Sequence, residues 1–198
     1  NFLLDEELIQ RLIEQAGVGP EDAVLEIGPG VGVLTTRLAR QAAAVAAVEL
    51  DRTLEAVLTE TLEGLDNVAV VYADALKTDL KALCREKLGD RPWKVCANLP
   101  YNVTKPLITA FLEAGCFETV TVMVQREVAR RLCARPGTEE YGAFTVLVDW
   151  YAQAEALFDV PPECFVPRPG VVSTVVQLTV RPAPPVAVED RDFFFRVV

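Results

Sequence analysis

The chain contains no histidine, and this absence narrows the chemistry that it can perform. Without an imidazole group, neither a Ser-His-Asp triad nor a Cys-His pair can form within the chain. The five cysteines lie far apart, and none belongs to the Cys-x-x-Cys spacing that zinc sites use. The sequence therefore predicts no metal site, and it favours reduced, mostly buried thiols in a cytoplasmic protein.

Long apolar runs and an excess of positive charge are also missing. Although 51% of the residues are hydrophobic, no uninterrupted apolar run approaches the roughly 18 residues that a membrane-spanning helix needs. The net charge is −10, so the surface as a whole repels the phosphates of a nucleic acid. A local basic cluster, formed by Arg126, Arg130, Arg131 and Arg135, is still compatible with binding to those phosphates.

Strand-like and helix-like segments alternate along the chain. The expected strands are 23–27, 45–50, 68–72, 95–97 and 120–124, and a helix is expected over 4–16 before them. The helices expected between and after these strands are 33–44, 51–63, 77–88, 104–114 and 127–134. This alternation predicts a parallel sheet that is covered on both faces. A further helix is expected at 142–151, and two last strands are expected at 156–160 and 173–180.

A glycine-rich loop, Gly28-Pro29-Gly30-Val31-Gly32, follows the first strand. A dinucleotide fingerprint needs a third glycine at position 33, where this chain has Val33. Pro29 also removes one of the N–H groups that would hold a pyrophosphate. The spacing is instead typical of loops that bind S-adenosylmethionine, a ligand without phosphate.

Acidic residues close the next two strands. Glu49 ends the second strand, where a carboxylate can accept hydrogen bonds from both ribose hydroxyl groups, and Asp74 follows the third strand. Because parallel strands present their carboxyl ends at one edge of the sheet, these acids and the glycine loop are predicted to border one crevice. We expect Asp74 to accept a hydrogen bond from the adenine amine of the cofactor.

The segment Asn98-Leu99-Pro100-Tyr101 leaves the fourth strand in a stiff, extended form, because Pro100 lacks an N–H group and biases Leu99 away from helical angles. The side-chain oxygen of Asn98 and the carbonyl oxygen of Leu99 can then point at one place beside the ring of Tyr101. Two acceptors and an aromatic face suit a planar amine, such as the N6 group of adenine.

Taken together, the motifs resemble those of the ribosomal RNA adenine dimethyltransferases. The resemblance covers nearly the whole chain, and it is strongest for the branch that dimethylates two adjacent adenosines near the 3′ end of small-subunit rRNA. It rests on Asn1-Phe2-Leu3, Glu26 to Gly32, Glu49, Asp74, Asn98 to Tyr101, Gln125 to Ala129, Tyr141-Gly142 and Phe165 to Ser173.

The resemblance implies a Rossmann-like α/β fold, the S-adenosylmethionine-dependent methyltransferase fold, with a mostly parallel seven-stranded sheet and helices on both faces. It implies a catalytic domain over 1–181, followed over 182–198 by a linker and the start of a helical C-terminal domain. The cofactor-binding residues it implies are Asn1, Leu3, Gly28, Glu49, Asp74 and Asn98. The residues it implies at the reacting amine are Asn98, Leu99, Tyr101 and Phe165, with Phe165 as a second stacking face.

The resemblance also implies partners and a place of action. We expect a cytoplasmic monomer that takes part in small-subunit maturation, binds rRNA and contacts no membrane. The basic cluster around Arg130 is the expected contact for the rRNA backbone. Three alternatives stay open: a large-subunit rRNA methyltransferase that confers antibiotic resistance, a silent assembly or transcription factor of the same fold, and an NAD-dependent dehydrogenase. The glycine spacing and the absence of histidine argue against the last.

Overall fold

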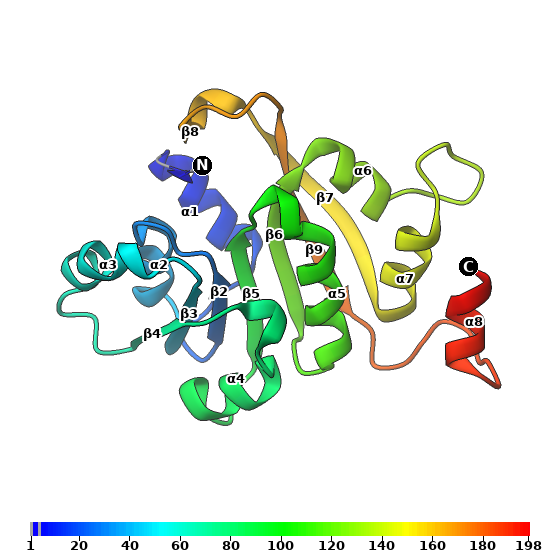
Figure 1. Ribbon diagram of the computed structural model, residues 1–198, viewed down its shortest axis with the longest axis horizontal. Helices are drawn as coiled ribbons and strands as arrows, with labels where there is room; N and C mark the ends of the chain where they lie inside the picture. Colours follow the sequence, from blue (N-terminus) through cyan, green and yellow to red (C-terminus); the bar gives the residue numbers. More distant parts are fainter. Residues whose placement is uncertain (1, 4) are drawn as a thin grey trace.

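The computed structural model describes residues 2–3 and 5–198, and its centre is a seven-stranded sheet with helices on both faces (Figure 1). The strand order is β4-β3-β2-β5-β6-β9-β7. Neighbouring strands from β4 to β6 are parallel, whereas β9 runs antiparallel to both β6 and β7. The predicted, mostly parallel sheet is thus confirmed. The strands are β2 (Ala23–Ile27), β3 (Ala44–Glu49), β4 (Val68–Tyr72), β5 (Trp93–Asn98), β6 (Thr119–Gln125), β7 (Ala152–Val160) and β9 (Ser173–Val180).

Helices follow most of the strands, as predicted. The α-helices are α1 (Glu6–Gln15), α2 (Val33–Ala39), α3 (Glu55–Thr61), α4 (Leu80–Leu88), α5 (Thr104–Ala114), α6 (Arg126–Leu132), α7 (Ala143–Tyr151) and α8 (Arg191–Val197). Short 3₁₀ turns are η1 (Arg52–Leu54), η2 (Ala75–Lys77), η3 (Tyr101–Val103) and η4 (Pro162–Cys164).

Several expected helices are shorter in the structure, and the one expected over 51–63 becomes η1 followed by α3. Local hydrogen bonds explain two other cases. The helix expected over 77–88 begins at Leu80, because the Asp79 side chain accepts a hydrogen bond from the Ala82 N–H group and caps the helix there. The helix expected over 33–44 ends at Ala39. Its last residues are drawn into the sheet, where the Ala43 N–H group donates to the Asp22 carbonyl oxygen and Ala44 pairs with Ala23.

Two apolar cores lie on opposite faces of the sheet. On one face, α4, α5, α6 and α7 contribute buried residues, among them Phe111 of α5. On the other face, Ile9, Leu12 and Ile13 of α1 pack with α2 against β2 and β3, since their spacing places them on one side of the helix. Burial on both faces explains why the central strands are almost wholly apolar.

A second, two-stranded sheet was not predicted. It pairs β1 (Phe2–Leu3) antiparallel with β8 (Phe165–Val166), with Leu3 opposite Phe165. The two strands are far apart in the sequence and lie side by side in the fold (Figure 1). This pairing carries Leu3 to the carboxyl edge of the large sheet, where the candidate site lies.

The C-terminal helix α8 rests beside α7 (Figure 1). The rings of Phe194 and Phe195 lie with their centroids 5.2 and 5.5 Å from that of Trp150 in α7. The division of the chain at residue 181 stays a prediction. Among the residues that the structure describes, no helix is both long and apolar enough to span a membrane.

The start of α2 depends on one glycine. Gly32 has a φ of +85°, and a Cβ atom added there would lie 3.2 Å from both Leu58 and Thr61 of α3. We expect Gly32→Ala to lower the free energy of unfolding by about 1–3 kcal/mol, the usual cost of such strain. Chemical denaturation measures this difference. Gly19→Ala is the matched control, because the φ of Gly19 is not positive and its added Cβ would be 3.6 Å from Asp22. Equal destabilisation of both variants would contradict the assignment of strain.

Candidate functional site

A cavity of about 300 Å³ opens at the carboxyl ends of β2, β3 and β5. Parallel strands meet their connecting loops at this edge, which is where α/β sheets bind ligands. Its residues come from β1, from these three strands of the large sheet and from the segments that follow them. The lining consists of Leu3, Glu26, Gly28, Pro29, Gly30, Val31, Val33, Leu34, Glu49, Asp51, Leu54, Asn98, Leu99, Pro100 and Tyr101.

The glycine loop forms one wall of this cavity, as expected. Gly28, Gly30 and Gly32 all have positive φ angles, of 70°, 59° and 85°. The Gly28 N–H group donates to the Val48 carbonyl oxygen of β3, which ties the loop to the neighbouring strand. Side chains are disfavoured at such angles, so the backbone itself faces the cavity and leaves room for a ligand to approach.

Glu49 at the end of β3 holds the loop from the other side. Its carboxylate is buried, with 7% of the residue exposed, and accepts hydrogen bonds from two N–H groups. Gly30 N lies 3.2 Å from Oε2, and Asp51 N lies 2.8 Å from Oε1. A carboxylate offers about four lone-pair sites. Glu49 can therefore support the loop and still accept hydrogen bonds from the hydroxyl groups of a ribose.

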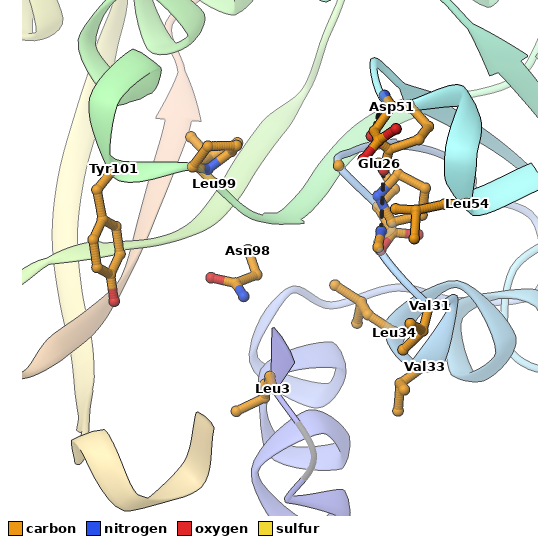
Figure 2. Close-up of a pocket in the computed structure, with 15 residues that line it drawn as sticks. Leu3, Glu26, Val31, Val33, Leu34, Asp51, Leu54, Asn98, Leu99 and Tyr101 are labelled. Atoms are coloured by element: carbon orange, nitrogen blue, oxygen red, sulfur yellow. Dashed lines mark hydrogen bonds between the residues drawn. The ribbon is translucent and has the colours of Figure 1, made fainter. Parts of the chain in front are cut away.

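The segment 98–101 forms the opposite wall. Asn98 ends β5, and in Figure 2 its side chain lies between Tyr101 and the apolar residues Val31 and Leu34. The Leu99 N–H group donates to the Met123 carbonyl oxygen of β6, 3.2 Å away, and Pro100 is extended at φ −60° and ψ 128°. The predicted stiff exit from the strand is confirmed.

Tyr101 is held in place by its hydroxyl group. The Tyr101 and Ser173 hydroxyl oxygens are 2.6 Å apart, in a hydrogen bond that joins η3 to the first residue of β9. Ser173 is fully buried, so the bond anchors the phenol end of the ring while the ring lines the cavity. An aromatic ring anchored in this way presents a flat face beside Asn98 (Figure 2).

Asp74 lies in a smaller pocket of about 110 Å³ that adjoins the first and shares Gly28, Glu49 and Pro100 with it. Its Oδ1 atom accepts from the Leu76 N–H group, and its Oδ2 atom is 3.2 Å from Lys77 Nζ. Leu50 and Leu76 flank this pocket and are 71% and 42% exposed. A pocket with apolar sides and a carboxylate at its rim suits a purine ring with an exocyclic amine. The sequence did not single out these two leucines.

Of the remaining predicted site residues, some line the cavity and others do not. Leu3 lines the cavity, and Asn1 lies outside the described residues. Phe165 is 2% exposed and packs in the core opposite Leu3 instead of lining the cavity. In this position it supports β1, and its role as a stacking face stays a prediction.

Glu26 lines the cavity, and the family resemblance includes it in a motif without implying a role for it. It is 1% exposed near the carboxyl end of β2, and its Oε2 atom has no hydrogen-bond partner among the described residues. Burial raises the pKa of its carboxyl group to about 8, and the nearby Glu49 carboxylate acts in the same direction. The signal was available: Glu26 is the one charged residue in a strand of otherwise apolar residues.

The chemistry of the lining indicates what can bind there. Three acidic residues, Glu26, Glu49 and Asp51, line the cavity, and no described lining residue is a lysine or arginine. Such a lining disfavours phosphate and favours a ligand with positive charge. S-adenosylmethionine, with a sulfonium, an ammonium, a ribose and an adenine, fits this combination. No group of acids and cysteines that could hold a metal ion occurs in the part of the chain that the structure describes.

A second cavity, of about 470 Å³, lies between α6 and the edge of the sheet and contains much of the basic cluster. Arg126, Arg130 and Arg135 line it, together with Asp159 and Thr174. Arg126 forms an ion pair with Asp159, at 3.0 Å. Its backbone N–H group donates to the carbonyl oxygen of residue 172, which precedes the serine that bonds Tyr101. This arginine groove is therefore joined to the wall of the first cavity.

Known proteins resemble the chain along its length. Two proteins named ribosomal RNA small subunit methyltransferase A, from Alkaliphilus oremlandii and Pelotomaculum thermopropionicum, are 45% and 47% identical to it. Both alignments cover 100% of this chain, and they cover 69% and 70% of the relatives.

Solved structures show the same fold. The 23S rRNA methyltransferase ErmE has a TM-score of 0.82 and 33% identity, over 95% of this chain and 73% of that one. A dimethyladenosine transferase from Plasmodium falciparum has a TM-score of 0.80 and 28% identity, over 91% of this chain and 64% of that one.

The family model described as ribosomal RNA adenine dimethylase matches residues 1–198. The matched range includes the glycine loop, Glu49 and the Asn98–Tyr101 segment that line the cavity. The chain belongs to the ribosomal RNA adenine dimethylase family.

Proposed function

We propose that this protein transfers methyl groups from S-adenosylmethionine to the N6 atoms of two adjacent adenosines near the 3′ end of small-subunit rRNA. It would act as a monomer in the cytoplasm, during maturation of the small subunit. The observation that carries the proposal is the shared cavity, which places Glu49 and the glycine loop on one side and Asn98 and Tyr101 on the other. The small-subunit substrate is supported by relatives of that name at 45% and 47% identity over the whole chain.

The donor would lie along the glycine loop. Glu49 would accept hydrogen bonds from the ribose, and the pocket with Asp74, Leu50 and Leu76 would take the adenine. When bound, the donor supplies an electrophilic sulfonium methyl group. The chain's own task is then to place the acceptor nitrogen in line with that methyl group and to exclude water.

The target adenine would enter beside Asn98 and Tyr101. The N6 lone pair is delocalised into the ring, and acceptors at the Asn98 side chain and the Leu99 carbonyl would bond the amine hydrogens and favour a more nucleophilic geometry. Tyr101 would stack on the base, an interaction worth about 1–3 kcal/mol. The base must first leave its own stack, which costs a few kcal/mol. No strong base is required, in keeping with the absence of histidine.

A second candidate substrate is large-subunit rRNA. The fold supports this substrate too, because the 23S rRNA methyltransferase ErmE has a similar structure, with a TM-score of 0.82. Methylation assays with the full-length protein, on undermethylated small subunits and on large-subunit rRNA, distinguish the two candidate substrates. Methyl transfer to large-subunit rRNA alone would overturn the small-subunit proposal. A silent factor of the same fold would methylate neither substrate.

Asn98 and Tyr101 are expected to act on turnover more than on donor binding. Asn98→Ala and Tyr101→Ala should reduce kcat strongly while the Kd of S-adenosylmethionine changes much less. Tyr101→Phe keeps the ring and removes only the bond to Ser173, so it should retain most of the turnover. Asn102→Ala, at an exposed neighbouring position, is the matched control. Equal reductions of donor binding and turnover would contradict these roles.

Glu49→Ala is expected to weaken S-adenosylmethionine binding by about 1–3 kcal/mol, because the variant cannot form a charge-assisted hydrogen bond to the ribose. Isothermal titration calorimetry measures the change, and Glu55→Ala on the exposed side of α3 is the control. Thermal denaturation of the variant checks that the glycine loop, which Glu49 also holds, has not unfolded. An unchanged donor affinity would count against the ribose hydrogen bond.

The arginine groove is expected to bind the rRNA backbone. Arg130→Glu should weaken rRNA binding and reduce the slope of log K against log salt by about 0.7–0.9 for each phosphate that the variant no longer neutralises. Arg91→Glu, at an exposed position just before β5 and away from the groove, is the control. If the salt dependence of rRNA binding had the same slope in both variants, the arginine groove would not be part of the RNA interface.

A further inference from the structure

The chain between the core residue of β8 and the start of β9, residues 166–172, is called the rim segment below, and the proposed reaction does not use it. Before it, Phe165 pairs with Leu3 of β1, which lines the donor cavity. After it, the Ser173 hydroxyl group bonds to that of Tyr101, which lines the same cavity. In Figure 1 the segment runs along the edge of the molecule from β8, beside β1, towards β9. The rim segment is therefore held at both ends by residues of the site.

Two valines of the rim segment are exposed to solvent. Val166 is 56% exposed and Val171 is 44% exposed. Among the described residues before residue 182, six large apolar residues are exposed; two of these, Leu50 and Leu76, flank the Asp74 pocket, and two are the rim valines. A single exposed apolar side chain is common on protein surfaces, but two in one short segment beside a cavity indicate a contact surface.

The backbone of the rim segment directs these side chains outward and keeps them in place. Val166 follows Phe165 in an extended strand, so the two side chains point in opposite directions, and Phe165 is 2% exposed in the core. Pro167 and Pro169 restrict the backbone between the two valines. A segment that is held at both ends and stiffened by prolines loses little conformational freedom when it binds a partner.

Positive charge lies next to the rim valines. Arg168, between them in the sequence, has a side chain that is 67% exposed and lies 3.5 Å from the Glu163 carboxylate. An exposed ion pair of this kind contributes little, so the guanidinium group stays available to a phosphate. At the other end, the backbone N–H group of Arg126, in the arginine groove, donates to the carbonyl oxygen of residue 172. Apolar side chains beside cations suit a nucleic acid, which combines stacked bases with an anionic backbone.

We propose that Val166 and Val171 form an apolar wedge that enters the rRNA stack beside the target adenine and fills the space that the extruded base leaves. The inference rests on the proposed function, because a wedge is needed only if the target base leaves its stack. Apolar side chains that insert between bases unstack them in other nucleic-acid complexes. The two valines would cover the neighbouring base faces that extrusion exposes to water, and would thereby lower the cost of extrusion.

Three substrates test the wedge, each assayed with the full-length protein. The first is the undermethylated small subunit. The second is a small subunit reconstituted with rRNA in which the nucleotide stacked on the target is abasic, so that the target adenine is held less firmly. In the third, the target adenine is replaced by 2-aminopurine, whose fluorescence rises when the base leaves its stack.

Val166→Ser combined with Val171→Ser should lower kcat/KM on the first substrate by about tenfold, which corresponds to about 1.4 kcal/mol. The rise in 2-aminopurine fluorescence should shrink in parallel. On the abasic substrate this variant should come within about twofold of the unmodified protein, because little stacking is left to break. Val166→Ile combined with Val171→Ile keeps the apolar surface and should retain activity on all substrates.

Val57→Ser is the matched control, because Val57 is 41% exposed on α3, outside the rim segment. It should behave as the unmodified protein does in every assay. Melting temperature and the Kd of S-adenosylmethionine should be unchanged in the serine variants, since no buried side chain and no donor contact is altered. Should the double serine variant fail to fold, Val171→Ser alone should give the same pattern with a smaller loss.

Different failures have different meanings. An unchanged kcat/KM or an unchanged fluorescence rise in the double serine variant would overturn the wedge and leave the proposed function intact. An equal loss on the ordinary and the abasic subunits would mean that the valines contact the ribosomal particle without unstacking a base, which also overturns it. So would a dimer of the unmodified protein that the serine variant does not form. No methylation of any subunit by the unmodified protein would instead overturn the proposed function.

Discussion

The site depends on one buried carboxylate. Glu49 closes β3 and accepts hydrogen bonds from Gly30 in the glycine loop and from Asp51 in the segment that leads to α3. Both N–H groups lie in turns that have no strand or helix partner to offer them, so the carboxylate substitutes for a backbone acceptor. The same residue borders the cavity. A single side chain thus sets the shape of the loop and supplies an acceptor for a ligand.

Charge is distributed around the site in a way that suits the two ligands that we propose for it. The donor cavity is lined by acids and by no described lysine or arginine, whereas the arginine groove lies just beyond the wall that carries Tyr101. A cationic donor and an anionic polymer can therefore bind next to each other without competing for the same side chains. The net charge of −10 leaves this local separation intact, since screening confines each effect to its surroundings.

Much of the site could be predicted because its parts follow consecutive strands. Gly28, Glu49 and Asn98 each lie at the end of a strand whose apolar run is plain in the sequence, and parallel strands bring those ends to one edge. Leu3 entered through family resemblance alone. An exposed leucine has no distinctive local pattern, so the two leucines beside Asp74 were missed. Glu26 belongs to the motif that carries the resemblance, but the motif assigns it no role, although a charged residue in a buried strand is unusual.

The sequence by itself determined the strand–helix alternation, the glycine-loop chemistry and the exclusion of histidine-based catalysis, because these follow from local patterns of residues. The tertiary structure decided what depends on distant segments. It paired β1 with β8, anchored Tyr101 to Ser173, and placed Phe165 in the core instead of the cavity. It also left one oxygen of Glu26 without a partner among the residues that it describes. Contacts between residues far apart in the chain, and the desolvation that they impose, arise only when the whole sheet has assembled.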